Sequence, residues 1–310
     1  MNMWKKVLAV LVVVGVGAGL AIWGAGPKTI ATSDEGNVTE SKYYKQLKQT
    51  PVGQQTLADM VVTEVLDSEY GKNVSKKDVD KKYDETRKEL GDQFEQQLAQ
   101  TGMSAQNYRD SIKLDLLKRE AVKANTNFSK ASLEKIYNDY QPKTSASVIL
   151  LGSEDDAKKI IKELDDKDGD FSKLAKKYSG DTDSKKNGGK LDDFDSTSTK
   201  VDSNVKKAAF DLENGKYSEK PVKAASNSGY YVVKRNTQEK KPSYDDMKND
   251  LKNLRVDEIM SNEDDVNVII GKELGKANVN IKDPDLKNAL AKYTQAAASD
   301  AADKQKKNDK

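Results

Sequence analysis

The sequence predicts an α+β protein in which a helical domain, built from an N-terminal and a C-terminal segment, carries an inserted α/β domain. Three observations predict this class. An uncharged apolar run stands near the N-terminus, both flanks repeat their apolar residues at helical spacing, and strand-like runs occur only between them. We therefore divide the chain into a membrane-directed segment (1–27), two helical segments (28–142 and 240–293), an α/β domain (143–239) and a tail (294–310).

The composition excludes several classes of function. Lysine and arginine number 53 against 51 aspartates and glutamates, for a net charge of +2, so we expect no nucleic-acid partner. The 310 residues include no cysteine and no histidine. These absences exclude disulfides, thiol nucleophiles, Cys/His zinc sites and Ser-His-Asp triads. We accordingly expect neither a metal nor another cofactor.

The run from 7 to 26 is uncharged, and its helical length roughly matches the hydrocarbon thickness of a bilayer. Lys5 and Lys6 precede it, so the positive-inside bias predicts export of everything that follows. Trp23 suits the membrane interface, whereas residues 29–31 offer a weak cleavage site. The sequence leaves open whether this segment is a cleaved signal or an anchor in the cytoplasmic membrane.

The segment 28–142 has the pattern of several amphipathic helices. The first of them is expected to bury one stripe, which consists of Leu57, Met60, Val61 and Val65. Gly71 ends this helix. A capping box formed by Ser75 and Asp78 then starts a single long helix, whose apolar stripe continues to Leu98.

The middle of the chain changes its period. Residues 145–151 and 229–235 are rich in branched and aromatic side chains and predict two strands. Helical patterns at 154–170, 171–179 and 205–212 lie between them. This alternation predicts a compact domain built on a small sheet.

Helical spacing returns beyond residue 241. We expect the two helical flanks to share one core, since each has more one-sided helices than it can bury alone. Three independent domains in a row are the alternative. The tail at 294–310 is polar and rich in alanine, which predicts disorder.

Six stretches stand in a distinctive order: ASVILL (146–151), DFSKLAKKYS (170–179), a glycine pair (188–189), KAAFDL (207–212), SGYYVVK (228–234) and YDDMKNDLK (244–252). This order resembles the PrsA foldases, exported lipoproteins or membrane-bound proteins of Gram-positive bacteria. The resemblance covers nearly the whole chain. Within it, residues 143–239 resemble a parvulin-type peptidyl-prolyl isomerase domain, and the helical flanks resemble a chaperone domain.

The resemblance also implies a site. Asp181 matches the acidic or thiol residue that parvulins place beside the substrate amide. Val148 and Tyr231 occupy the positions of the two parvulin histidines, and Val201 and Val205 replace a larger methionine and phenylalanine. The candidate substrate-binding residues are Val148, Leu191, Val201, Val205, Ser228 and Tyr231.

These departures predict weak or lost isomerase activity. Rotation about a prolyl amide requires no proton transfer, so histidine is not indispensable, but it would orient Asp181. The alternative interpretation makes Asp181 a loop carboxylate in an Asx turn, with Gly188 and Gly189 only turning the chain. Because side chains alternate along a strand, one of Tyr230 and Tyr231 belongs to the core and the other lines the groove.

Two functions follow from these observations. The first is a foldase for secreted proteins at the outer face of the cytoplasmic membrane or outside the cell, with unfolded exported chains as partners. The second is a non-catalytic cell-surface scaffold or adhesin. A hydrolase that pairs Asp181 with Asp192 or Asp193 is a weaker third hypothesis, because loop residues leave their separation undefined. A homodimer is left open.

Overall fold

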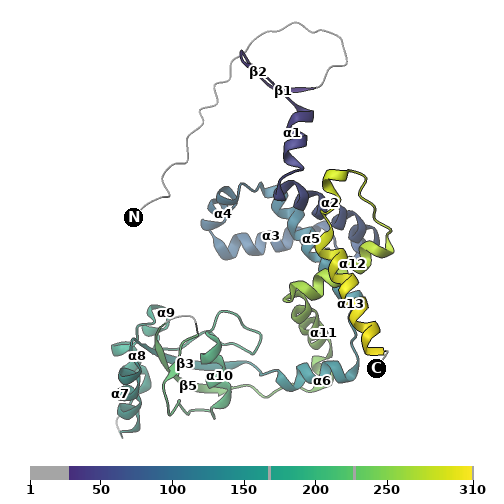
Figure 1. The fold of residues 1–310 in the computed structure, drawn as a ribbon. Helices are drawn as coiled ribbons and strands as arrows, with labels where there is room; N and C mark the ends of the chain where they lie inside the picture. Colours follow the sequence, from purple (N-terminus) through teal and green to yellow (C-terminus); the bar gives the residue numbers. More distant parts are fainter. Residues whose placement is uncertain (1–27, 167–168, 226–227, 309–310) are drawn as a thin grey trace. The chain divides into compact units, whose positions relative to one another are not determined.

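The computed structural model describes residues 28–166, 169–225 and 228–308. Figure 1 shows many helices, a small antiparallel sheet and a separate hairpin of two strands. The mixed helical and sheet class predicted from the sequence is confirmed. The apolar run at 7–26 lies outside the described residues. Among the residues that are described, none of the helices is long and apolar enough to span a membrane.

Two compact units divide the described chain. One contains residues 28–61 and 279–291, and the other contains residues 62–278 and 292–308. The domain boundaries derived from the sequence remain a prediction. The elements of the first unit are β1 (Thr29–Ser33), β2 (Gly36–Thr39), α1 (Glu40–Leu47), the start of α2 (Pro51–Tyr70) and the short η2 (Pro284–Leu286).

The first unit is held together by hydrogen bonds and ion pairs. β1 and β2 pair antiparallel, and α1 follows them directly. Lys48, one residue past α1, pairs with Asp283 at 2.9 Å and with Asp285 at 2.8 Å. These two carboxylates raise the pKa of Lys48, chiefly through their hydrogen bonds to the ammonium group. The end of α1 is thereby fastened to the segment around η2.

The second unit contains the remaining helices outside the middle region. They are η1 (Gly71–Asn73), α3 (Lys76–Leu90), α4 (Gln93–Thr101), α5 (Ala105–Ala124), α6 (Lys130–Asp139), α11 (Tyr244–Met260), α12 (Glu263–Lys276) and α13 (Ala291–Asn308).

Local signals set the ends of these helices. The Ser75 hydroxyl accepts a hydrogen bond from Asp78 N at 3.2 Å, and Asp78 Oδ2 accepts one from Ser75 N at 2.9 Å. This pair confirms the predicted capping box. The single long helix predicted beyond it is wrong. Gly91 has φ of 52°, in the left-handed region that favours glycine, and it ends α3 before α4 begins.

The stripe predicted for α2 is displaced by one position. The side chains that the structure buries completely are Ala58, Val62 and Leu66. Leu57, Val61 and Val65 lie half-buried at the margin, and Met60 is exposed. Two adjacent rows of this helix are both apolar, so helical spacing alone does not identify the row that begins with the small Ala58 as the buried one.

The tail predicted to be disordered is instead helical as far as Asn308, the last described residue. α13 includes Tyr293, which is 1% exposed. Gly271 of α12 permits the close approach, because a β-carbon there would stand 2.1 Å from Tyr293 O and 2.8 Å from Ala297 Cβ. Alanine, lysine and glutamine have high helix propensity, so a composition typical of disorder forms a helix when one face packs against another helix.

Helices from both sides of the middle region pack together within the second unit. Leu133 of α6 shares a buried cluster with Met247 and Leu251 of α11. The rings of Tyr137 and Tyr244 meet edge to face at a centroid distance of 5.7 Å. The chain therefore enters the middle region from α6 and returns from it into α11, two helices that are packed neighbours.

A polar network lies within the same helical core. Glu273 of α12 is 5% exposed, accepts a hydrogen bond from Asn125 Nδ2 at 2.9 Å and pairs with Lys276 at 2.7 Å. Tyr70, the last residue of α2, is hydrogen-bonded to the same carboxylate. Desolvation by burial, followed by the charge of Glu273, raises the pKa of Tyr70 to about 12. The network joins α2, α5 and α12.

We expect the free energy of unfolding to fall between about pH 10 and pH 12. A tyrosine whose pKa is raised in the folded state stabilises the fold fully below its unfolded pKa of 10.0 and loses that contribution as the pH passes about 12. Urea unfolding at a series of pH values measures the decline, and Tyr70→Phe should flatten it.

Tyr217 provides the matched comparison for this titration. Its hydrogen bond to Asp165, at 2.7 Å, raises its pKa to about 12 as well, so Tyr217→Phe should remove a separate part of the decline. An equally steep decline in the Tyr70→Phe variant would contradict the role of the Glu273 network.

The middle region is built on an antiparallel sheet with the strand order β3-β5-β4. Its strands are β3 (Thr144–Leu151), β4 (Val222–Lys223) and β5 (Tyr230–Gln238). Its helices are α7 (Glu154–Asp165), α8 (Phe171–Tyr178), α9 (Thr182–Lys185) and α10 (Ser203–Asp211).

The two faces of this sheet have separate cores. Ile149 packs with α7 and α8 on one face, whereas Val148 packs with α10 on the other. Tyr230 contacts the first core and Tyr231 the second. The prediction that these two tyrosines separate by face is confirmed, because successive strand residues point to opposite sides.

Irregular segments pair with the outer edge of β3 and with the part of β5 that lies beyond the short β4. Beside β3, Val148 N donates to Gly189 O at 2.8 Å and Leu191 N donates to Ala146 O at 3.0 Å. Beside β5, Gly215 N donates to Arg235 O at 2.7 Å, and Ser218 N donates to the carbonyl of residue 233 at 2.8 Å. The loop 189–194 is therefore part of the sheet although it forms no regular strand.

Candidate functional site

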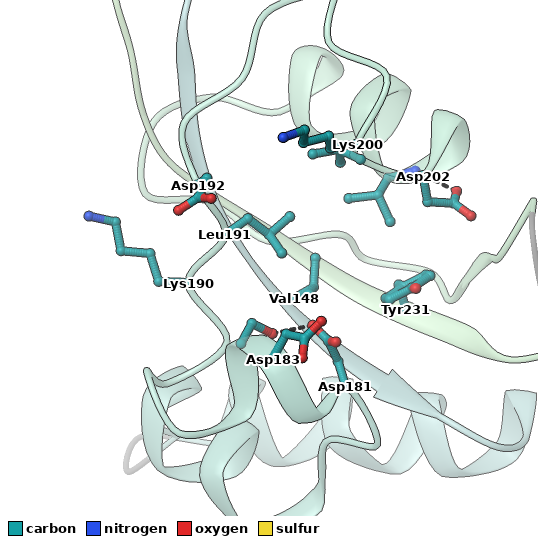
Figure 2. A pocket seen from close by; sticks show the side chains of 12 residues that line it. Val148, Asp181, Asp183, Lys190, Leu191, Asp192, Lys200, Asp202 and Tyr231 are labelled. Atoms are coloured by element: carbon teal, nitrogen blue, oxygen red, sulfur yellow. Dashed lines mark hydrogen bonds between the residues drawn. The ribbon is translucent and has the colours of Figure 1, made fainter. Parts of the chain in front are cut away.

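A pocket of about 340 Å³ opens on the α10 face of the sheet (Figure 2). The residues predicted from the sequence that line it are Val148, Asp181, Leu191, Val201, Val205 and Tyr231. Ser228, the seventh predicted residue, lies exposed in the loop before β5 and does not line the pocket. The structure thus brings together six residues that span more than eighty positions of the chain.

The floor of the pocket is apolar. Val148 and Val205 are each 1% exposed, and Leu191 and Val201 are half-buried. Val148 stands opposite Val233 in the β3–β5 ladder, two residues from Tyr231. Val148 and Tyr231 are therefore diagonal neighbours on one face of the sheet, close enough for long side chains to meet.

Asp181 stands at the mouth of this apolar floor, immediately before α9. Its Oδ2 accepts a hydrogen bond from the hydroxyl of Ser184, which is 4% exposed. Asp181 N donates to Ser179 Oγ at 3.2 Å, and the same hydroxyl accepts from Leu150 N at 3.1 Å. Asp181 caps no backbone N–H of α9 through its side chain, so the predicted Asx turn is wrong. A buried serine orients the carboxylate instead.

The glycine pair shapes the loop that carries Leu191. Gly188 and Gly189 have φ of 68° and 81°, values that other residues adopt only with strain. A β-carbon on Gly189 would stand 2.3 Å from the carbonyl oxygen of Val148 and 3.1 Å from Ala175 Cβ. Gly189 N also donates to Ser184 O at 2.9 Å. The pair therefore couples the Asp181 segment to the strand that forms the floor.

A charged rim surrounds the floor, and of its members only Asp192 was a candidate from the sequence. Its members are Asp183, Lys190, Asp192, Lys200 and Asp202 (Figure 2). Asp202 Oδ1 accepts from Asn204 N at 2.9 Å, and its Oδ2 accepts from Ala225 N at 2.8 Å. Asp202 directly precedes α10, and an aspartate at the start of a helix is a capping signal that could have located it. Apart from Asp192, the other rim residues could not be identified from the sequence, because they come together only where separate loops meet in the fold.

This arrangement can bind an apolar ring and place a carboxylate beside it. No group of three or more potential metal ligands occurs within the described part of the chain. Of the carboxylates in the hydrolase hypothesis, Asp192 lines the pocket, but Asp193 does not and pairs with Lys143 at 3.7 Å. The chemistry at hand is the orientation and desolvation of a bound chain.

Residues 151–237 match the family described as Rotamase, the PPIC-type PPIASE domain. The sheet, its helices and the pocket thus define a parvulin-type peptidyl-prolyl isomerase domain. A foldase protein PrsA from Pediococcus pentosaceus is 41% identical over 295 residues, which cover 95% of this chain and 98% of that protein. The foldase protein PrsA of Streptococcus pneumoniae has a solved structure with a TM-score of 0.67 and 34% identity, covering 86% of this chain and 99% of that one.

A further relative agrees with these two. Foldase protein PrsA 1 of Lactobacillus johnsonii is 38% identical and covers 94% of this chain and 97% of its own length. The chain belongs to the PrsA foldase family. The resemblance stated from the sequence motifs is confirmed.

Proposed function

We propose that this protein is an extracytoplasmic foldase that assists secreted proteins after translocation, and that its parvulin-type domain is a weak isomerase. The pocket carries this proposal. It joins an apolar floor to Asp181, yet valine and tyrosine stand at the two positions where parvulins usually have histidines. Unfolded secreted chains that contain proline are the proposed substrates.

The mechanism depends on binding the twisted amide better than the planar one. Rotation about a prolyl bond faces a barrier of about 20 kcal/mol that arises from amide resonance. A proline ring held on Val148, Leu191 and Val205 moves its carbonyl away from water, which removes hydrogen bonds that favour the planar form. Asp181, oriented by Ser184, is the polar group beside the reacting bond.

Weak activity follows from what surrounds Asp181. In this pocket Val148 supplies an aliphatic side chain and Tyr231 a phenol ring at the two positions where imidazoles would stand. Only one side-chain hydrogen bond, from Ser184, is found for Asp181 among the described residues. A substrate amide is consequently held less firmly than in a parvulin with both histidines, and its placement governs much of the rate of isomerisation.

The helical part supplies the holding function in this proposal. A groove of about 620 Å³ on α6 and α11 is lined by Phe128, Tyr137 and Tyr244 together with lysines and carboxylates. Aromatic side chains offer large apolar area with a polar tip, which suits transient contact with unfolded chains. No described feature specifically favours the scaffold or adhesin.

The location is part of the proposal. The uncharged run 7–26 behind Lys5 and Lys6 supports a chain that is held at, or released from, the outer face of the cytoplasmic membrane. A retained anchor is the form we propose, since Trp23 suits the interface. A homodimer is the competing arrangement, in which a second copy would cover the apolar side chains exposed between residues 30 and 47.

Proline-limited refolding of a client protein tests the proposed activity. We expect a modest acceleration by the purified chain and loss of most of it in Asp181→Ala. Asp193→Ala is the matched control, because it removes the same charge from a neighbouring loop, outside the pocket. Suppression of client aggregation should persist in both variants. Vigorous acceleration by the unaltered chain, or loss of aggregation suppression in Asp181→Ala, would contradict the proposal.

A further inference from the structure

The exposed apolar side chains of this protein are concentrated near the N-terminus. Nine large hydrophobic residues in the described part of the chain are strongly exposed, and seven of them lie between residues 30 and 60. Five belong to the hairpin and α1, and we call them the N-terminal apolar surface: Ile30, Val38, Tyr43, Tyr44 and Leu47. Tyr43 is 55% exposed and Tyr44 51%, so α1 presents aromatic rings to its surroundings.

The elements that carry this surface are too small to be stable alone. α1 has eight residues and buries none of them, and every residue of β1 is exposed. Isolated helices of this length and isolated hairpins of two strands are at best marginal in water. A further surface must therefore cover them if they are to persist.

The chain path places this surface beside the end of the apolar run. Glu40 N donates to Lys28 O at 2.7 Å, and Lys28 Nζ pairs with Glu40 Oε2 at 3.2 Å. The first residue of α1 is thereby fastened two residues beyond position 26. Two residues span at most about 7 Å, and an eight-residue helix is about 12 Å long. The whole of α1 therefore lies within about 20 Å of that point.

The chemistry of α1 fits a lipid interface. Tyr43, Tyr44 and Leu47 share one face, because Leu47 lies four positions after Tyr43 and three after Tyr44. Tyrosine rings favour the headgroup level, where their apolar body and polar tip both find partners. Lys42 and Lys45 lie on the opposite side of α1, so they can stay in water when the tyrosine face meets the lipid, as in other interfacial helices.

We propose that the hairpin and α1, residues 29–47, dock on the lipid surface of the cytoplasmic membrane through the N-terminal apolar surface (Figure 1). The proposal rests on the membrane location proposed for the run 7–26. The Lys48 ion pairs with Asp283 and Asp285 then connect the docked segment to the rest of its unit, so docking holds that unit at the interface.

The absence of cysteine permits a direct test with the full chain. Single variants Tyr44→Cys and Leu47→Cys are labelled with a fluorophore and reconstituted in vesicles of phosphatidylcholine and phosphatidylglycerol. Tyr178→Cys is the matched control, because Tyr178 is a 39% exposed aromatic residue in the middle region. Nitroxide-bearing lipids should quench positions 44 and 47 several-fold more than position 178.

Each outcome decides a separate point. Flotation of the chain with the vesicles reports on the anchor alone, so failure to float removes the proposed membrane location. In floating protein, lipid quenching at positions 44 and 47 no stronger than at position 178 overturns the docking. A second copy would instead shield the labels from water without lipid quenching, and the shielding would disappear when the protein is diluted with more lipid. That result would also overturn the docking. A variant that combines Tyr43→Ser, Tyr44→Ser and Leu47→Ser should still float with the vesicles. In that variant, a label attached through Val38→Cys should be quenched far less by the lipids than in the otherwise unaltered chain.

Discussion

Gly189→Ala should destabilise the middle domain by about 2–5 kcal/mol. The φ of 81° costs a non-glycine residue about 1–2 kcal/mol in the left-handed region. The added β-carbon also meets Val148 O at 2.3 Å, and overpacking of this kind costs about 1–3 kcal/mol more. Thermal unfolding of the full chain, followed through the aromatic signal of the middle domain, measures the change.

Gly215→Ala is the control that separates the two effects. Gly215 has the same φ of 81°, but a β-carbon there meets nothing within 4 Å. This variant should lose only the backbone part, and its hydrogen bond to Arg235 O should remain. Equal losses in the two variants would show that the approach of the loop to β3 matters little.

Val148→His with Tyr231→His should raise the isomerase activity by about tenfold to a hundredfold, the range that placement of a reacting group commonly controls. Positions 148 and 231 are diagonal neighbours on the face that carries the pocket, so two imidazoles there can share hydrogen bonds. Their frame would orient the Asp181 carboxylate and the substrate carbonyl. Catalysed exchange of a short prolyl peptide, followed by NMR, measures the rate.

Val148→Asn with Tyr231→Asn is the matched control for the paired histidines. It introduces polar groups at the same two positions without imidazoles. Both pairs of substitutions disturb a floor in which Val148 is 1% exposed, so the melting temperatures of both variants should be compared first. Equal activity in the folded asparagine and histidine variants would contradict a specific role for imidazole at these positions.

The sequence was most informative where one period dominates a segment. Ala157, Ile160, Ile161 and Leu164 repeat at helical spacing, and α7 buries all four. The strands β3 and β5 were equally accessible to prediction, because branched and aromatic residues cluster there between turn signals. The family motifs then identified six residues of the pocket, which no spacing rule could have brought together.

The errors have physical reasons. Gly91 stands in a helical pattern that continues on both sides, and only its left-handed conformation separates α3 from α4. The alanine-rich tail forms a helix because Gly271, which lies outside the tail, lets α13 pack closely against α12. Ser184 was missed because its hydroxyl matters only through Asp181, three residues earlier on a tight turn.

The paired edges of the middle sheet have a consequence for a protein that works among unfolded chains. Such chains carry unsatisfied backbone groups and readily extend any open strand into a growing aggregate. Here the loop 189–194 occupies the outer side of β3, and the segment 215–218 continues the pairing of β4 along the side of β5 that faces away from β3. A client can therefore contact side chains in the pocket, but it finds little free backbone along β3 and β5 with which to form a further strand.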